Sequence, residues 1–374
     1  MQRRVTLVVP EYPPHSVGGG GIAYRAIAHS IHAQGRAVRV LTGDSRGVTR
    51  KDLDGPIEVL RFGLLPYPAR LPFLNGYMPP YPTTTLRDRL ALIDENEIVH
   101  VHGLFLGFCD AVSLAMLRRR RPYFLTNHGY PQRIRQLKRP YYDFMRLYER
   151  IVVARVARGA LGVSAISQFC AVDGPLAERP IEIIPNGIDV GVFDDPGERP
   201  SSNLIFVGRL QPDKGTDIAL RALAQAKGAV LTVIGPDAGE REHLERLARG
   251  LGVERRVVFR GALPREDVMG EQRRAYAMLM PSLNEPFGLV GLEAMANGSL
   301  LVCSDRGGHR SYANETNALL FQTGNATALA GVLKQFPLEH ERYRSIRAHA
   351  FDTSKAHTWS KVAERYLEWY ARFE

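Results

Sequence analysis

Cysteine is scarce in this sequence of 374 residues: Cys109, Cys170 and Cys303 lie far apart. An odd number of widely spaced cysteines without a Cys-x-x-Cys pair provides neither a disulfide framework nor a zinc knuckle. No group of possible ligands has metal-binding spacing, and neither a Gly-x-Ser-x-Gly elbow nor a Walker loop occurs. We therefore expect no metal and no cofactor. This cysteine usage is typical of a reducing compartment, so we expect a cytoplasmic protein.

Long apolar runs are also missing. No stretch approaches the roughly 20 apolar residues of a membrane-spanning helix. The run Val5–Val9 ends at Pro10 and is too short for the core of a signal peptide. With 45% hydrophobic and 24% charged residues, the composition is that of a globular protein. The length exceeds one ordinary α/β core and suits two.

Acidic residues are few in one stretch only. Between Leu117 and Ala160 there are twelve Lys or Arg and two Asp or Glu, which accounts for the whole formal charge of +10. Aromatic residues are interleaved there. Four interpretations fit: a solvated helical face, or contact with an anionic membrane surface, with a phosphate-bearing acceptor or with nucleic acid. No nucleic-acid recognition motif accompanies the stretch, so we expect no nucleic-acid partner. Together with the Pro/aromatic segment Leu71–Tyr81, it favours peripheral docking on the inner face of an anionic membrane.

Apolar runs alternate with helical patterns along the whole chain, which predicts parallel sheets with helices on both faces. The expected strands are Val5–Val9, Val38–Leu41, Ile57–Phe62, Ile98–His102, Tyr123–Thr126, Leu161–Ile166, Ile181–Ile184, Asn203–Val207, Ala229–Ile234, Val257–Arg260, Ala277–Met280 and Leu300–Ser304. A polar, turn-rich linker at Phe193–Ser202 separates domain 1–192 from domain 203–350. The fold class is therefore α/β, with two Rossmann-like domains facing each other across a cleft. Ligands are expected beyond the carboxyl ends of the strands.

The segment from Pro281 to Gly298 contains two carboxylates in an E-x7-E pattern, Glu285 and Glu293, around a Pro-Phe-Gly turn. The turn opens a helix, so the first N–H groups, those of Leu289 and Val290, form an anion site without a charged side chain. Glu285 precedes the turn, where it can accept hydrogen bonds from sugar hydroxyls. Glu293 lies within the helix, where a carboxylate can bind the paired hydroxyls of a ribose.

A second loop follows a strand and precedes a helix, in the order Gly208-Arg209-Leu-x-x-x-Lys214-Gly215. Gly208 permits close approach of the backbone. Arg209 offers a planar fork for phosphate oxygens and Lys214 a point charge. Two fixed cations can stabilise the negative charge that develops on a departing diphosphate. The alternative is a pair of solvated cations in a βα loop.

Weaker signals lie elsewhere. The glycines at 18–21 follow the first strand and are compatible with a loop that approaches a phosphate or sugar or, equally, with a flexible loop without a ligand. A helix is expected from Ile22 to Ala33 after it. His102 and His128 end two strands and should emerge at the carboxyl edge of the sheet. For each, the alternative is a structural histidine. Asn186 belongs to an Asn-Gly turn beside the linker.

These motifs resemble retaining glycosyltransferases of the GT-B fold, glycosyltransferase family 4, over nearly the whole chain. The segments that carry the resemblance, in the family's order, are Tyr12-Pro-Pro…Gly-Gly, Asn127-His-Gly129, Pro185-Asn-Gly-Ile-Asp189, Gly208-Arg-Leu…Lys-Gly215 and Glu285-x7-Glu293. The chain departs from the family at Arg36, at Asn297 and at His309-Arg310, where His, Cys and Pro-Glu are frequent.

The resemblance implies a metal-independent enzyme that transfers a hexosyl group from a nucleotide sugar to a glycan or lipid-linked acceptor, with retention, in cell-envelope polysaccharide or glycoconjugate synthesis. Domain 203–350 would bind the donor, and domain 1–192 the acceptor, with the last helix, 357–374, packing back on it. The implied catalytic residues are Glu285, His128, Arg209 and Lys214. The donor site adds Gly208, Phe287, Gly288, Leu289, Val290, Glu293 and Asn186. Gly19, Gly20, His102 and His128 would lie on the acceptor side.

Two other classes of function fit some of the residues. A glycoside hydrolase would use Glu285 and Glu293 as acid and nucleophile, but both lie on one loop and helix beside a phosphate site that hydrolysis does not need. A basic membrane- or nucleic-acid-binding protein without transferase activity would use Arg118–Arg158. The glycosyltransferase is favoured over both.

Overall fold

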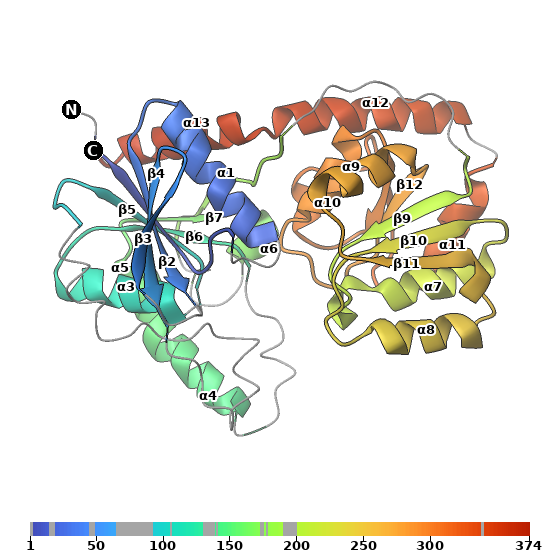
Figure 1. Ribbon diagram of the computed structural model, residues 1–374, viewed down its shortest axis with the longest axis horizontal. Coiled ribbons are helices and arrows are strands. Elements are labelled where there is room, and N and C mark those ends of the chain that lie inside the picture. The colour runs from blue at the N-terminus through green and yellow to red at the C-terminus, as the bar shows by residue number, and fades with distance from the viewer. Residues whose placement is uncertain are drawn as a thin grey trace. The chain divides into compact units, whose positions relative to one another are not determined.

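The computed structural model describes most of the chain and divides it into two compact units (Figure 1). The described residues are 3–14, 19–44, 49–64, 93–104, 107–129, 139, 141–172, 176, 179–189, 200–337 and 340–374. The first unit is Met1–Gly187 with Trp359–Glu374, and the second is Ile188–Thr358. The segment Leu71–Tyr81 and most of the linker Phe193–Ser202 lie outside the described residues.

The first unit contains an eight-stranded sheet in the order β3-β4-β2-β1-β5-β6-β7-β8. Its strands are β1 (Val5–Val9), β2 (Val38–Asp44), β3 (Arg50–Asp54), β4 (Ile57–Gly63), β5 (Ile98–His102), β6 (Phe124–Asn127), β7 (Gly162–Ala165) and β8 (Glu182–Ile183). All neighbours are parallel except the edge pair β3 and β4. The central strands β1 and β5 are buried over their whole length, as expected for parallel strands covered on both faces.

The described part of this unit also contains helices. They are α1 (Gly19–Ala33), α3 (Gly107–Arg118), α4 (Tyr141–Tyr148), α5 (Ala154–Gly159), α6 (Gln168–Ala171) and α13 (Trp359–Ala371), with a π-helical segment, Glu149–Val153, between α4 and α5. Within the unit, α1 packs against α13 and α3 against α5. The final helix, expected over 357–374, thus belongs to the first unit, where Trp369 lies against Phe124 with 4.8 Å between ring centroids.

The second unit contains six strands, all parallel to their neighbours, in the order β11-β10-β9-β12-β13-β14. They are β9 (Asn203–Val207), β10 (Val230–Ile234), β11 (Val257–Gly261), β12 (Ala277–Met280), β13 (Leu300–Ser304) and β14 (Leu319–Phe321). The helices are α7 (Thr216–Gln225), α8 (Arg241–Gly250), α9 (Arg265–Arg274), α10 (Leu289–Ala296), α11 (Ala326–Gln335) and α12 (His340–Ala356). Figure 1 shows α7, α8 and α11 on one face of the sheet and α9 and α10 on the other. Both units therefore have the predicted Rossmann-like arrangement.

The glycine-rich segment differs from the prediction. Gly18 lies outside the described residues, but Gly19, Gly20 and Gly21 form the first turn of α1 rather than a loop. The first N–H groups of a helix have no intrahelical acceptor. Glycine can therefore occupy the first turn without weakening hydrogen bonds inside the helix. Gly21 is buried, as are Ala23 and Tyr24, and this packing supports a start three residues before Ile22.

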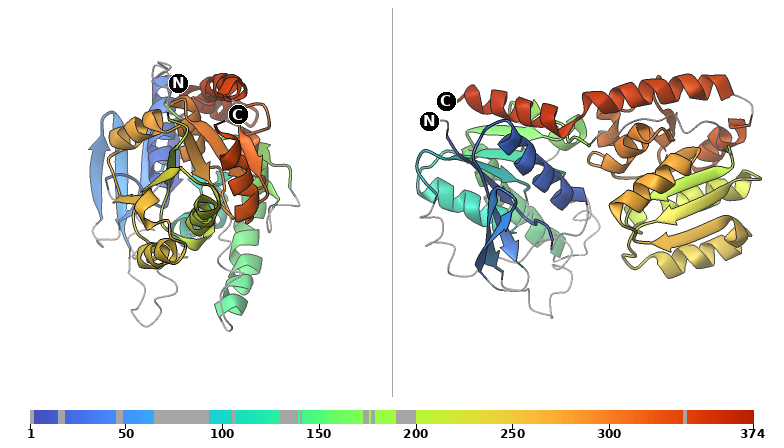
Figure 2. Two further views of the ribbon diagram at one scale, coloured as in Figure 1. Left: turned by 90° about the vertical axis from the view of Figure 1, so that its right-hand side faces the viewer. Right: turned by 45° about the horizontal axis from the view of Figure 1, so that its top comes forward.

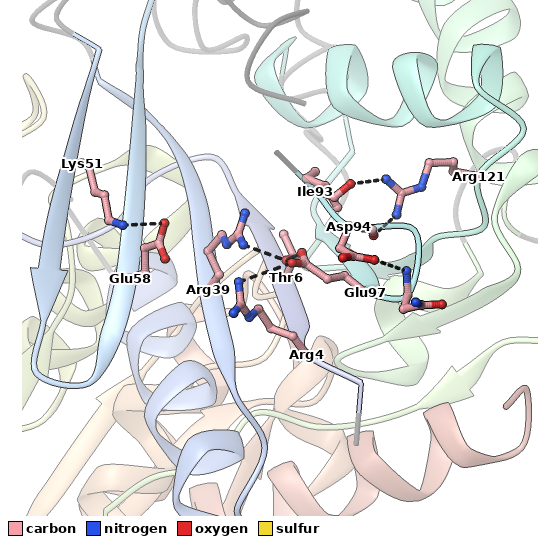
Figure 3. A network of polar contacts seen from close by, with 10 residues as sticks. Arg4, Thr6, Arg39, Lys51, Glu58, Ile93, Asp94, Glu97 and Arg121 are labelled. Atoms are coloured by element: carbon pink, nitrogen blue, oxygen red, sulfur yellow. Dashed lines mark hydrogen bonds and ion pairs between the residues drawn. The ribbon is translucent and has the colours of Figure 1, made fainter. Parts of the chain in front are cut away.

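A buried carboxylate fastens the amino-terminal edge of the first sheet (Figure 3). Glu97 is 7% exposed and accepts hydrogen bonds from Thr6 Oγ1 at 2.6 Å and from Arg39 Nη2 at 3.0 Å. These contacts join β1, β2 and the turn before β5. A buried charge is tolerable only when paired and hydrogen-bonded, and Glu97 is both.

Part of the basic stretch has a structural use. Arg121 donates to the carbonyl oxygen of Ile93 at 2.6 Å and to that of Asp94 (Figure 3). Arg146 forms an ion pair with Glu149 at 2.6 Å. The stretch is therefore not a uniform surface patch. In the described part of the chain, no helix is long and apolar enough to cross a membrane.

Candidate functional site

The loop after β9 is held by close backbone contacts, and the contact at Gly215 requires glycine. Gly208 donates its N–H to the carbonyl oxygen of Ile234 at 2.9 Å. Gly215 has φ +69°, and a Cβ there would overlap the carbonyl oxygen of Pro281 at the end of β12. Because glycine has no Cβ, the loop from 208 to 215 can lie directly against the loop that follows β12.

This contact brings the two sequence motifs together. Leu283 donates its N–H to the carbonyl oxygen of Asp213 at 2.8 Å, which joins the two loops backbone to backbone. Next to that bond, Lys214 Nζ lies 2.8 Å from Glu285 Oε2. The side chains are only 16% and 11% exposed, respectively. Ser282 Oγ donates to the same carboxylate oxygen at 3.3 Å. The predicted sugar-binding carboxylate is thus paired with the predicted phosphate-binding lysine.

Helix α10 begins beside this pair. Gly288 adopts a left-handed conformation, φ 83° and ψ 54°, and a Cβ there would lie 3.2 Å from Glu285 Cγ. Tyr312 Oη donates to the Gly288 carbonyl oxygen at 2.5 Å and fixes the turn. Within the described residues, the N–H groups of Leu289 and Val290 have no acceptor. Two N–H donors at a helix start, with the helix dipole behind them, are suited to bind an anion.

The second glutamate has a different environment. Glu293 lies in α10, and its Oε1 is 3.2 Å from Nη2 of Arg265, which also lies 3.5 Å from Asp189. Burial raises the pKa of Glu293, and the charge of Arg265 opposes this rise. Arg265, the first residue of α9, therefore holds the Glu293 carboxylate in a largely buried position. Sequence reasoning missed Arg265 because α9 has few apolar residues and was not predicted.

The backbone of Glu285 contacts the turn at Gly307 and Gly308. Gly308 donates its N–H to the Glu285 carbonyl oxygen at 2.6 Å. His309, at one of the departures from the family pattern, is fully buried, and its Nε2 donates to the carbonyl oxygen of Ser304 at 2.6 Å. Burial lowers the pKa of His309, so this ring is neutral. The residues 307–309 thus fix the backbone at Glu285.

The structure also describes the other predicted donor residues. Arg209 is exposed and has no ion-pair partner among the described residues. Phe287 is 2% exposed and packs on Tyr312, with ring centroids 5.3 Å apart. Asn186 belongs to the first unit, where it is 5% exposed. Its role at the donor stays a prediction.

The predicted acceptor-side residues gather at the carboxyl ends of β5 and β6. His102 Nδ1 lies 2.8 Å from His128 Nε2, and the edge of Tyr24 from α1 faces both rings. Burial lowers the pKa of His128 to about 3 and that of His102 well below its ordinary value. Gly20, in the first turn of α1, also lies beside Tyr24: a Cβ there would be 3.5 Å from Cε2. Gly19 directly precedes it.

Two family models match the chain, one in each unit. The Glycosyltransferase Family 4 model matches residues 17–192, and the Glycosyl transferases group 1 model matches residues 197–352. A glycosyltransferase of Methanocaldococcus jannaschii, named as uncharacterized, is 25% identical over 98% of this chain and 97% of its own. A D-inositol 3-phosphate glycosyltransferase of Nocardia farcinica is 30% identical over 51% of this chain, which spans about half (47%) of that relative.

Solved structures resemble the whole chain. Sucrose-phosphate synthase from Thermosynechococcus elongatus has a TM-score of 0.78 and 20% identity, with 99% of both chains covered. Anabaena HepE in complex with UDP-glucose has a TM-score of 0.71 and 20% identity, covering 99% of this chain and 100% of its own. These matches show the two-domain fold that the motifs predicted. The chain belongs to the glycosyltransferases of group 1 and family 4 and has the GT-B fold.

Proposed function

We propose that this glycosyltransferase is a retaining, metal-independent hexosyltransferase that uses a nucleoside diphosphate sugar as donor and a hydroxyl group of a glycan or glycolipid as acceptor. One observation carries the proposal: the 2.8 Å pair of Lys214 and Glu285 lies against the start of α10. A cation, a carboxylate and two N–H donors thus adjoin one another, which suits a sugar joined to a diphosphate. The similar Anabaena HepE was solved with UDP-glucose.

Each residue then has a role set by its chemistry. Lys214 and the N–H groups of Leu289 and Val290 stabilise the negative charge that grows on the departing diphosphate, and Arg209 adds a second cation. Glu285 orients hydroxyls of the transferred sugar. Glu293 accepts hydrogen bonds from the ribose hydroxyls. The leaving diphosphate takes the proton of the attacking hydroxyl, so acceptor oxygen and leaving group share one face and the anomeric configuration is retained.

The pairing of both glutamates argues against hydrolysis by the same residues. A retaining hydrolase needs one carboxylic acid that donates a proton and one free carboxylate that attacks. Here Glu285 pairs with Lys214 and Glu293 with Arg265. Each carboxylate is thus engaged in an ion pair, and neither is the free carboxylate that must attack the anomeric carbon. The product distinguishes the two reactions, because transfer releases a nucleoside diphosphate and hydrolysis of a glycoside does not.

The first test is binding followed by transfer. A panel of nucleotide sugars is screened for a rise in melting temperature, since a ligand of the native state stabilises it. The best donor is then used with Arg209→Met and Lys214→Met, each compared with an exposed control, Arg221→Met and Lys227→Met. We expect loss of nucleoside diphosphate release in the first pair only, and unchanged transfer in the presence of EDTA. Full activity of Lys214→Met would reject the proposed roles, and an inverted anomer in the product would reject retention.

We also propose that the acceptor domain, 1–192 with the last helix, docks on an anionic membrane surface through α4. This helix projects away from its sheet (Figures 1 and 2). Phe144 and Leu147 in α4 and Ile151 in the π-helical segment after it, three or four residues apart, are 52%, 56% and 59% exposed. Arg150 and Arg155 are exposed beside them. An apolar stripe flanked by arginines suits the interface of an anionic bilayer.

Vesicle binding tests this surface. Leu147→Glu should weaken sedimentation with phosphatidylglycerol vesicles, whereas Leu53→Glu, at a position 74% exposed on β3, should not. Binding should fall as salt rises, because exposed charges are screened. Equal binding of both variants, or binding to neutral vesicles alone, would contradict docking through α4.

A further inference from the structure

His102 and His128, both in the first unit, form a contact that determines which ring nitrogen of each carries the proton. His100 and His102 alternate along β5 and therefore lie on one face of the sheet, with ring centroids 4.1 Å apart. His128 follows β6, the neighbouring strand, and its Nε2 is 2.8 Å from His102 Nδ1. Both His100 and His102 are fully buried.

The ring nitrogens differ in their partners. His100 is satisfied at both nitrogens: Nδ1 lies 2.6 Å from Tyr370 Oη, and Nε2 lies 2.6 Å from Thr126 Oγ1. His102 is satisfied only at Nδ1. Its Nε2 is buried and has no hydrogen-bond partner within the described part of the chain.

This asymmetry selects a tautomer. A neutral imidazole carries one proton, and a hydrogen bond between two ring nitrogens needs that proton on one side. A proton on His102 Nε2 would be a buried N–H without an acceptor, which is rarer and more costly than an unfilled acceptor. His102 therefore carries its proton on Nδ1 and donates it to His128 Nε2. Burial keeps both rings neutral by lowering each pKa.

The consequence falls on His128. Because its Nε2 accepts a hydrogen bond, its own proton must lie on Nδ1. A ring in this state has no free lone pair and cannot act as a general base. It can donate one N–H bond from Nδ1 to an oxygen.

We infer that His102 is a positioning residue that holds His128 as an Nδ1–H donor toward an oxygen of the acceptor bound by the first unit. The inference rests on the proposed function for the substrate and on the geometry alone for the tautomer. No covalent step involves either ring, and both stay neutral throughout.

Nuclear magnetic resonance tests the tautomer directly and without substrate. Protein labelled with ¹⁵N-histidine is measured by long-range ¹H–¹⁵N correlation at neutral pH, and His128 is assigned by its absence in His128→Gln. We expect a protonated Nδ1 and an unprotonated, hydrogen-bonded Nε2. A proton on Nε2 of His128 would overturn the inference.

Two variants at position 102 test its consequence for transfer. His102→Leu removes the donor, whereas the amide of His102→Asn can still donate near the position of Nδ1. We expect the leucine variant to lose the Nδ1–H preference of His128 and about tenfold in kcat, the loss that one hydrogen bond implies, and the asparagine variant to recover both. UDP, which contacts the second unit in the proposed function, should bind both variants alike.

The outcomes separate this inference from the proposed function. An unchanged tautomer and an unchanged kcat in a folded His102→Leu protein would refute positioning by His102. If wild-type protein shows the expected tautomer but transfers no sugar from any nucleotide donor, the proposed function is refuted. The positioning of His128 by His102 is then still supported by the tautomer. Asparagine must recover kcat as well as melting temperature, because recovery of melting temperature alone would indicate a purely structural residue and overturn the inference.

Discussion

Lys214 and Glu285 are 71 residues apart in the chain, yet Nζ and Oε2 lie 2.8 Å from each other. The contact is built by the backbone, since Gly215 fits against Pro281 and Leu283 bonds to Asp213. A nearly buried ion pair is expensive to break, because removal of one partner leaves the other charge unpaired away from water.

The stability of single and double variants should reflect this pairing. Lys214→Met leaves the Glu285 carboxylate unpaired, and we expect the free energy of unfolding to fall by about 3 kcal/mol. Adding Glu285→Gln should recover most of that loss, because the stranded charge is removed. Urea denaturation measures Lys214→Met, Glu285→Gln and the double variant, with the exposed Lys227→Met as control. Strictly additive effects would show that the two side chains do not interact.

The glycine contact between the loops makes a second prediction. Gly215 and Gly228 both have positive φ, +69° and +83°, but only at Gly215 would a Cβ meet backbone. Gly228→Ala should cost about 1 kcal/mol from backbone conformation alone. Gly215→Ala should cost clearly more and should also abolish transfer, because it displaces Lys214 from Glu285. If both substitutions lower the urea midpoint equally, the close approach at Pro281 is not required.

The ionised side chain of Glu293 should destabilise the folded protein while it contributes to donor binding. Burial raises its pKa above the ordinary value, so the ionised form that prevails at neutral pH works against the folded state. Glu293→Gln should therefore raise the urea midpoint at pH 7 and weaken donor binding. The gain should vanish as the pH falls below about 4, where the native and unfolded carboxyls are both protonated. Glu242→Gln, at a side chain 84% exposed, should change neither quantity.

The buried histidines should make the first unit sensitive to acid. Burial lowers the pKa of His100, His102 and His128, the last to about 3. The unfolded chain binds protons below about pH 6.5 while the native rings stay neutral, so acidification favours unfolding by about 1.4 kcal/mol per pH unit for each histidine. His128→Asn should lower the slope of the unfolding free energy against pH by the amount that corresponds to one bound proton. His243→Asn, at an exposed position, serves as the control. A slope that is the same in His128→Asn and wild type would contradict the lowered pKa of that ring.

Sequence patterns predicted the apolar part of the fold well and the polar part poorly. The bounds of β5, β9, β12 and β13 agree with the expected strands because apolar residues predominate in each of these short segments. β3, with the sequence RKDLD, and α9, in which only Gln272 is buried, carry too few apolar residues for a periodic signal. These elements are fixed by tertiary contacts instead.

For the candidate site, motif spacing identified the residues but not their partners. Arg265 remained unrecognised because its helix has no apolar face, although it is the ion-pair partner of Glu293. The contact of His102 with His128 depends on which strands are neighbours. Pairing of β5 with β6 is a property of the sheet and not of either local sequence.

The helix α13, residues Trp359–Ala371, completes the unit that the amino-terminal residues begin. Its Tyr370 is bonded to His100, and a Cβ at Gly162 would lie 2.9 Å from Trp369 Cζ2. During synthesis these contacts form only after the second unit has emerged from the ribosome. The first unit emerges from the ribosome without α13, the helix that contacts His100 and Phe124. These residues are covered only after the second unit has been synthesised. Order of synthesis and order of completion are therefore reversed, and a chain that stops a few turns early leaves the earlier unit unfinished, not the later one.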